Sequence, residues 1–176
     1  MRHEHLDRIA ERLKTGEEKA FDELYDATYK AVFVKAYSVL KDRMKAEDVL
    51  QETYLTIYNK IGTYVSGTNF LAWILTIAGR LAINEYHRLK RETPAEDDYL
   101  NVKIGGKGFD GTENWLVDAA GKILEQDEFE IVMAAVMGGY RRREIAEVLG
   151  LPVSTVSWKY KKGLEKLKKY LEEKAE

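Results

Sequence analysis

The sequence predicts an all-α protein that contains two small helical domains joined by a flexible linker. Three observations lead to this fold class. The 176 residues include only two prolines, Pro94 and Pro152, and both fall between helical patterns. Apolar residues recur at helical spacing along most of the chain, with no competing strand-like alternation. Residues 93–112 are rich in glycine and acidic side chains, and they interrupt this periodicity as a linker would.

The composition excludes several classes of protein. One third of the residues are charged and 45% are hydrophobic, which is typical of an ordinary soluble protein. Cysteine is absent, so the chain forms no disulfide and no thiolate metal site, and it fits a reducing cytosol. The first residues lack an apolar signal core, and the apolar run FLAWILTIA is too short to cross a bilayer. We expect an intracellular protein.

Charge is distributed unevenly along the chain, although the net charge is only −2. Lys and Arg number 15 against 14 Asp and Glu in residues 1–94, 3 against 10 in residues 95–131, and 10 against 6 in residues 132–176. A basic final section is consistent with a surface that faces phosphates, although lysine-rich helices are more often simply solvated.

Apolar spacing predicts two long helices in the first third of the chain, over about residues 17–41 and 46–61. The buried stripe of the first is predicted to contain Phe21, Leu24, Tyr25, Thr28, Val32, Ala36, Val39 and Leu40. The inward side of the second is predicted to contain Val49, Leu50, Thr53, Tyr54, Ile57 and Ile61.

The second helix also carries a polar cluster, within the stretch AEDVLQETYLTIYNK. Asp48, Gln51 and Glu52 are spaced by three and four residues, so they share one helix face. Carboxylates and an amide in this arrangement suit oriented hydrogen bonds to Arg and Lys of a partner. The alternative is a first helical turn enriched in acids, which the helix dipole explains better for Asp48 than for Glu52.

A third helix, from about residue 69 to 91, is apolar nearly all round through Ala82 and polar from Asn84 onward. We expect Trp73 in its buried part. Its polar end presents amide and cationic donors on a single face: Arg80, Asn84, His87, Arg88 and Arg91. Such a face suits phosphates and base edges. Periodicity alone slightly favours a solvated helix end.

The glycine-rich stretch GGKGFDG in the linker does not predict a nucleotide site. No GK pair followed by Ser or Thr is present, and no strand precedes the stretch.

The C-terminal part is predicted to form four helices, over about 113–124, 127–137, 142–149 and 154–173. The last two, with the turn at Gly150 to Pro152, are typical of a helix-turn-helix. Its small core would contain Ile145, Ala146, Leu149, Leu151 and Val156. The inward stripe of the final helix would contain Val156, Tyr160, Leu164, Leu167 and Leu171.

The outward side of the final helix presents Ser154, Thr155, Ser157, Trp158, Lys161 and Lys162. In a helix-turn-helix these first turns enter the major groove, so these residues are the expected base and phosphate contacts. Trp158 is ambiguous, because burial preference favours packing against a neighbouring helix over contact with a thymine methyl or a sugar.

Three motifs, in this order, resemble bacterial sigma factors of the extracytoplasmic-function (ECF) type in the sigma-70 family. They are AEDVLQETY, NFLAWILTIAGRLAINEYHRLKR and REIAEVLGLPVSTVSWKYKKGLEKL, and the resemblance extends from about residue 16 to 171. The absence of the additional segments of housekeeping sigma factors favours the compact ECF group.

The resemblance implies an alternative-type sigma factor, not an enzyme, that binds core RNA polymerase and directs transcription initiation. Residues 1–92 would be a sigma region 2-like domain, 93–112 the linker, and 113–176 a region 4-like helix-turn-helix domain. The polar cluster of Asp48, Gln51 and Glu52 would bind the clamp of the largest polymerase subunit. The C-terminal domain would sit on the flap of the second-largest subunit. An anti-sigma factor is a further implied partner.

The resemblance also implies the DNA contacts. Arg80, Asn84, His87, Arg88 and Arg91 would capture and melt the minus-10 promoter element, and the connection over residues 63–68 would help to capture an extruded base. The minus-35 element would be read by Arg142, Ser154, Thr155, Ser157, Trp158, Lys159, Lys161 and Lys162. Because a tether raises the effective concentration of the second site, two weak contacts together can hold a promoter.

The sequence departs from the family pattern in its DNA-binding stretches. Residues 154–159 read STVSWK where Gly-Thr-Val with basic and small residues is usual, so the minus-35 preference is expected to be unusual. Arg80 and Asn84 stand where Asn and Asp are common, which makes the minus-10 face more positive. The acidic linker could shield these basic faces in the free protein. Unchanged DNA affinity after neutralisation of its acidic cluster, Glu96, Asp97 and Asp98, would exclude that hypothesis.

Three other classes of protein compete with this interpretation. A helix-turn-helix regulator would need only the C-terminal half and leaves Asp48 and its neighbours without a purpose. An enzyme acting on nucleic acid is disfavoured because His3, His5 and His87 do not cluster and no nucleophile–base pair is visible. A helical scaffold is the third. We expect no cofactor, no metal site and no membrane insertion.

Overall fold

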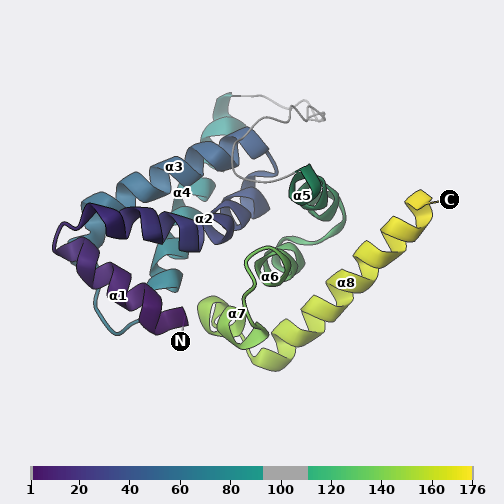
Figure 1. Ribbon diagram of the computed structural model, residues 1–176. Helices are drawn as coiled ribbons and strands as arrows, with labels where there is room; N and C mark the ends of the chain where they lie inside the picture. The colour runs from purple at the N-terminus through teal and green to yellow at the C-terminus, as the bar shows by residue number, and fades with distance from the viewer. Residues whose placement is uncertain (1, 93–110, 176) are drawn as a thin grey trace.

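The computed structural model describes residues 2–92 and 111–175, and this part of the chain is helical without any strand (Figure 1). The predicted all-α fold is confirmed. The acidic cluster at 96–98 lies outside the described residues. The elements are α1 (Arg2–Lys14), α2 (Glu18–Leu40), α3 (Arg43–Lys60), the short 3₁₀ helix η1 (Ile61–Thr63), α4 (Phe70–Glu92), α5 (Gly111–Ile123), α6 (Gln126–Val136), α7 (Arg142–Leu149) and α8 (Val153–Ala175).

The first helix, α1, was not predicted from the sequence. It buries Leu6, Ile9 and Ala10 almost completely, against α2 and α4. These positions, followed by Leu13, have the i, i+3, i+4, i+7 spacing of an amphipathic helix. The many charged residues between them hid this short apolar ridge.

Helices α2, α3 and α4 form the body of the N-terminal half, and α2 is covered on two sides. Besides α3 and α4, it packs against α6 of the C-terminal half. Its buried arc is therefore wider than predicted and includes Phe33, Val34 and Tyr37. Tyr25, predicted to be buried, is instead exposed and stacks on Tyr29 with ring centroids 5.5 Å apart.

Helices α5 to α8 form the C-terminal half, in which α8 crosses closely over α6. A Cβ at Gly163 would come within 2.7 Å of Val132 Cγ2, so this crossing requires glycine. The far end of α8 extends beyond its neighbours (Figure 1). Leu171, in this end, is exposed, and Leu164 is exposed because Gly163 and Leu167 occupy the buried side of α8 there. Both findings correct the predicted burial.

The turn of the helix-turn-helix has the expected geometry at its start. Gly150 adopts the left-handed conformation with φ of 65°, and the Leu151 backbone N–H donates to the Ala146 carbonyl at 3.0 Å. The Leu151 side chain is exposed, which corrects its predicted place in the small core. Ile145, Ala146 and Val156 are buried as predicted.

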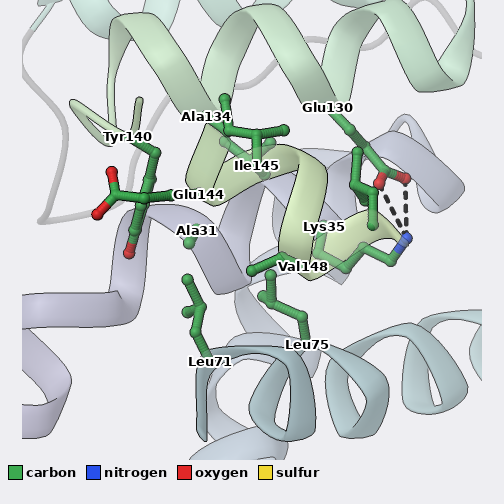
Figure 2. Close-up of a pocket in the computed structure, with 12 residues that line it drawn as sticks. Ala31, Lys35, Leu71, Leu75, Glu130, Ala134, Tyr140, Glu144, Ile145 and Val148 are labelled. Carbon is green, nitrogen blue, oxygen red and sulfur yellow. Dashed lines mark hydrogen bonds and ion pairs between the residues drawn. The ribbon is translucent and has the colours of Figure 1, made fainter. Parts of the chain in front are cut away.

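The two halves contact each other along α2. Lys35 on α2 pairs with Glu130 on α6 at 2.9 Å (Figure 2). The Ser38 hydroxyl donates to the same carboxylate at 2.7 Å. Beside this pair is a small apolar cavity of about 40 Å³. It is lined from both halves, by side chains that include Leu71, Leu75, Ile145 and Val148 (Figure 2).

Three ion pairs between α2–α3 and α5–α6 share one polarity, in which the N-terminal half supplies the cation. Lys30 pairs with Glu113 at 2.5 Å, and Arg43 pairs with Asp118 at 3.3 Å, as Lys35 does with Glu130. The division of the chain at residues 92 and 113 stays a prediction. None of the described helices is long and apolar enough to cross a membrane.

Candidate functional site

The polar cluster of α3 is exposed. Asp48, Gln51 and Glu52 all lie on the solvent side of the helix, away from the buried Ile57, and the Asp48 side chain is 69% exposed. Lys45 is the nearest cation, 3.9 Å from the Asp48 carboxylate, at the limit of an ion pair. The cluster is therefore available to a partner.

The start of α3 argues against the helix dipole as the reason for these acids. The helix begins at Arg43, earlier than predicted, and Asp42 caps it by accepting from the Lys45 backbone N–H at 2.9 Å. No acidic residue lies in the first turn. Asp48 and Glu52 lie beyond the turn in which the dipole acts, so another role has to account for them.

Large apolar side chains extend the polar cluster along the same face of α3. Leu55 is 65% exposed and Tyr58 is 70% exposed, and Met44 is exposed at the other end. With the polar cluster they form the α3 strip, which consists of Met44, Asp48, Gln51, Glu52, Leu55 and Tyr58. Exposed apolar residues beside oriented polar groups are typical of a protein-docking surface. Helical spacing in the sequence could have identified the additional residues. Met44 is four residues before Asp48, Leu55 is four after Gln51, and Tyr58 is three after Leu55.

The polar end of α4 brings three of the predicted residues around one shallow hollow. Asn84, His87 and Arg91 line it together with Lys90. Arg80, one turn earlier, is also exposed. We call these five residues the α4 face. Lys90 was missed by the sequence prediction, and it also lies 4.9 Å from the centre of the Tyr86 ring.

Arg88 differs from the other predicted minus-10 residues because its guanidinium is held within α4. It pairs with Glu85 at 2.6 Å and with Glu92 at 2.7 Å. The hydrogen bond from Arg88 lowers the pKa of Glu85, and the same contacts raise the pKa of Arg88. The structure therefore leaves Arg88 less available to an external phosphate than Arg80 or Arg91.

The first turns of α8 present the predicted minus-35 residues to solvent to different degrees. Ser154, Trp158 and Lys161 are exposed, as is Arg142 at the start of α7, while Thr155 and Ser157 are partly exposed. Trp158 is 59% exposed, so the preference for its burial was wrong. Its outward position follows from Val156, which fills the inward position and is fully buried.

Two predicted DNA-binding lysines of α8 are instead paired with carboxylates at the start of α6. Lys159 hydrogen-bonds to Asp127, which raises the pKa of Lys159 and lowers the pKa of Asp127. Lys162 lies 3.0 Å from Glu128, and Lys166 one turn later lies 2.6 Å from it. These pairs bind α8 to α6.

Glu128 is the centre of this network, with a side chain that is only 1% exposed. Burial opposes its ionisation, but the hydrogen bonds from Lys166 and Lys162 prevail and hold its pKa below the ordinary value. It also accepts from the Glu125 backbone N–H at 3.2 Å, which caps α6. A buried carboxylate thus orients two lysines on the recognition helix.

The paired lysines also flank Trp158. The Lys162 ammonium lies 5.2 Å from the centre of the indole and the Lys159 ammonium 5.9 Å from it. Cations at this distance attract an aromatic ring. The indole is consequently supported from the protein side while its other surface remains open to a ligand.

Comparison with known proteins agrees with this geometry. The family model of sigma-70 region 2 matches residues 24–92, which include the α3 strip and the α4 face. The RNA polymerase sigma factor CarQ of Myxococcus xanthus is 27% identical over 93% of this chain and 95% of its own length. The ECF RNA polymerase sigma factor SigW of Bacillus subtilis is 24% identical over 91% and 93%. Residues 24–92 therefore resemble sigma-70 region 2, and more than nine tenths of the chain is similar to curated RNA polymerase sigma factors, SigW of the ECF group among them.

Two solved structures share the fold of this chain. CnrH, in complex with the cytosolic domain of CnrY, aligns with a TM-score of 0.65 at 21% identity, over 94% of this chain and 96% of that one. The sigma factor RpoE of Bartonella quintana, in complex with the anti-sigma factor NepR, aligns with a TM-score of 0.64 at 20% identity, over 88% and 98%. At this identity the likeness concerns the fold.

Proposed function

We propose that this protein is an ECF sigma factor that binds core RNA polymerase through the α3 strip and directs it to promoters. The exposure of that strip is the observation that supports the proposal most strongly. Burying Leu55 and Tyr58 would stabilise the isolated protein, so their exposure favours contact with a partner. Their contact with a partner helix would supply apolar area, while Asp48, Gln51 and Glu52 would bind its Arg and Lys side chains. The partner would be the clamp of the largest polymerase subunit.

The α4 face would hold the minus-10 element. Its guanidinium and ammonium groups suit the phosphate backbone, and Asn84 and His87 can donate to base edges. Melting further requires a place for an unpaired base, which we assign to the segment around residues 63–68 beside the aromatic rings of Tyr64, Phe70 and Trp73. Arg88 would act mainly by keeping α4 regular up to Glu92.

The recognition helix α8 would read the minus-35 element. Ser154, Trp158 and Lys161 project from its first turns, where helix-turn-helix proteins contact base edges. Arg142 lies 5.4 Å from the Tyr160 ring and would reach the backbone from α7. Lys159 and Lys162 would support the indole of Trp158 and contribute little to phosphate binding. The rest of the C-terminal domain would sit on the polymerase flap.

The role proposed here is not enzymatic, because phosphodiester chemistry would remain with the polymerase. The protein would act in the cytoplasm, where polymerase and promoter DNA are found. The two solved structures described above are complexes, one with the cytosolic domain of CnrY and the other with the anti-sigma factor NepR. We propose that an anti-sigma factor regulates this chain as well.

Run-off transcription tests the proposal. Purified core polymerase is incubated with a library of promoter fragments, with and without the protein. The expected result is specific transcripts that appear only with the protein and that depend on the α3 strip. Absence of any protein-dependent start site would overturn the proposal, and dependence on α8 alone, with Gln51→Ala/Glu52→Arg fully active, would favour a simple helix-turn-helix regulator.

A further inference from the structure

The segment between η1 and α4 is tied to α1. We call residues 64–69 the 64–69 loop. The Tyr64 hydroxyl donates to Asp7 Oδ1 at 2.7 Å and lies 2.8 Å from the Thr68 carbonyl oxygen, so it links α1 to both ends of the loop. Burial, and then the hydrogen bond to Asp7, raise the pKa of Tyr64 to about 12. The hydroxyl is therefore protonated and able to donate at neutral pH.

A second tie holds the tip of the loop. The Ser66 hydroxyl donates to the Glu11 carboxylate and accepts from the Lys14 ammonium at 2.6 Å. Lys14 and Glu11 also pair with each other at 3.1 Å. Three side chains thus form a closed triangle, in which two belong to α1 and one to the loop. Lys14 additionally lies 5.4 Å from the centre of the Tyr64 ring.

The helix that provides these ties is itself fixed. Its apolar ridge is buried against α2 and α4, as described above. At its end the Arg12 guanidinium donates to two carboxylates of the next segment, to Glu17 at 2.9 Å and to Glu23 at 2.7 Å. Two such bonds from one planar group define an orientation. α1 is therefore a rigid support from which Asp7 and Glu11 project toward the loop.

The loop tip itself is open to solvent. Val65, Ser66 and Thr68 are exposed, and Gly67 adopts a φ of 81°, a conformation that other residues rarely adopt. Beneath the tip, the buried rings of Tyr64 and Phe70 lie 4.6 Å apart and Trp73, partly exposed, lies 5.6 Å from Tyr64. Contacts from α1 therefore hold the exposed loop tip, above these aromatic side chains, in one conformation.

We propose that α1 is a positioning element for strand opening, in which Asp7 and Glu11 hold the 64–69 loop in the conformation that receives an unpaired base. The inference rests on the function proposed above for this loop. The matched region 2 segment begins at residue 24, so it does not extend to α1. A loop ordered in advance binds an unpaired base without the entropy loss of ordering at that moment. Asp7 and Glu11 act through Tyr64 and Ser66 and need no contact with DNA.

Two matched double variants separate positioning from charge. Asp7→Ala/Glu11→Ala removes both hydrogen-bond acceptors, whereas Asp7→Asn/Glu11→Gln keeps an acceptor oxygen at each position. Both variants remove the same two negative charges, so simple electrostatics predicts the same stronger attraction to DNA in each. Glu4→Ala, on the same helix, is the control for a change in α1 that leaves the loop contacts in place.

Two measurements are made on each protein. Amide hydrogen exchange of residues 63–69 in the full-length protein reports the order of the loop. Affinity of the polymerase complex is compared between a forked promoter fragment with an unpaired minus-10 strand and the same fragment as a full duplex. For the alanine pair we expect exchange about tenfold faster and a preference for the fork about tenfold weaker, the effect of losing about one hydrogen bond to a charged group. The amide pair and Glu4→Ala should stay within about twofold of the wild type in both measurements.

Three results are decisive. If the wild-type complex shows no preference for the fork, the strand-opening function proposed for the loop fails, whatever α1 does. If the wild type prefers the fork and the alanine pair keeps that preference, the inference about α1 is wrong, with or without a change in exchange. If the amide pair loses the preference as strongly as the alanine pair, charge and not hydrogen bonding controls the surface, and the inference is again wrong.

Discussion

The α4 face and the first turns of α8 both carry basic and polar residues, but their cations differ in whether they pair with other side chains of the protein. On α4, Arg80 and Arg91 are exposed to solvent. On α8, Lys159 and Lys162 pair with Asp127 and Glu128 of α6. The N-terminal surface therefore offers its charge to a ligand, whereas the C-terminal surface uses much of its charge to hold its own recognition helix.

This difference suggests that the two proposed DNA-binding surfaces contribute different interactions. Electrostatic attraction and its salt dependence should come mainly from the α4 face. Shape and apolar contact should matter more at α8, where Trp158 is the most exposed large side chain of the first turns. The following predictions test that difference, from the largest expected effect to the smallest.

Replacing Glu128 should have the largest effect. Glu128→Ala leaves Lys162 and Lys166 without their common carboxylate and removes a cap of α6. We expect the free energy of unfolding to fall by about 3 kcal/mol, at the lower end of the range for breaking a buried ion pair because the lysines are partly exposed. Chemical denaturation followed by circular dichroism measures this. A loss below about 0.5 kcal/mol, the size expected at an ordinary surface position, would mean that the α6–α8 pairs do not hold the recognition helix.

Removing cations from the α4 face should strongly weaken promoter binding. Arg80→Ala/Arg91→Ala removes two phosphate contacts, so the slope of log affinity against log salt should fall by about 1.8. Arg88→Ala is the matched control, because its guanidinium is occupied by Glu85 and Glu92. Titrations of the polymerase complex with promoter DNA at several salt concentrations give both slopes. Equal effects of Arg88→Ala and of Arg91→Ala alone would contradict the distinction drawn within α4.

The α6–α8 network should make the protein sensitive to acid. The folded pKa of Glu128 lies below the ordinary value of 4.5, so the unfolded chain binds the proton first as the pH falls. The stabilisation is complete above about pH 4.5 and is lost as the pH falls through the folded pKa. Thermal unfolding between pH 7 and pH 3.5 should show this decline, and Glu128→Gln should make it smaller. An identical decline in both proteins would place the acid sensitivity elsewhere.

Adjacent lysines on α8 provide the smallest and most selective effect. Lys161 is exposed, whereas Lys162 is paired with Glu128. Lys161→Ala should lower the salt slope of promoter binding by about 0.9 and leave stability unchanged. Lys162→Ala should change the slope by less than half of that and lower stability instead. If Lys162→Ala has the larger effect on the slope, the pair with Glu128 opens on DNA and the two surfaces are more alike than the structure indicates.

Local periodicity predicted the helices well, because each long helix has one dominant apolar face. The bounds of α7 agree with the prediction, and those of α2, α4 and α6 differ by only a residue or so. It failed for α1, whose ridge of Leu6, Ile9 and Ala10 is short and surrounded by charge. It also failed for Leu171, because no neighbour covers the far end of α8, and for Leu164, because Gly163 and Leu167 occupy the buried side of the helix instead.

The candidate sites were predicted as far as helix faces can predict them. Spacing alone places Asp48, Gln51 and Glu52 together and away from Ile57. Pairing between elements is a different problem, because it depends on how two helices cross. The approach of α8 to α6 at Gly163 decides that Lys162 meets Glu128. No pattern within α8 distinguishes Lys162 from Lys161, so only the three-dimensional structure separates them.

Affinity for core RNA polymerase tests the central claim most directly. Gln51→Ala/Glu52→Arg reverses a charge and removes an amide on the α3 strip, and Glu18→Arg makes the same charge reversal at an exposed position on α2. With folding verified by circular dichroism, we expect the double variant to bind core polymerase about 100-fold more weakly, the effect of losing about two charge-assisted hydrogen bonds. Glu18→Arg should bind like the wild type. Wild-type affinity in the Gln51→Ala/Glu52→Arg protein would contradict the account.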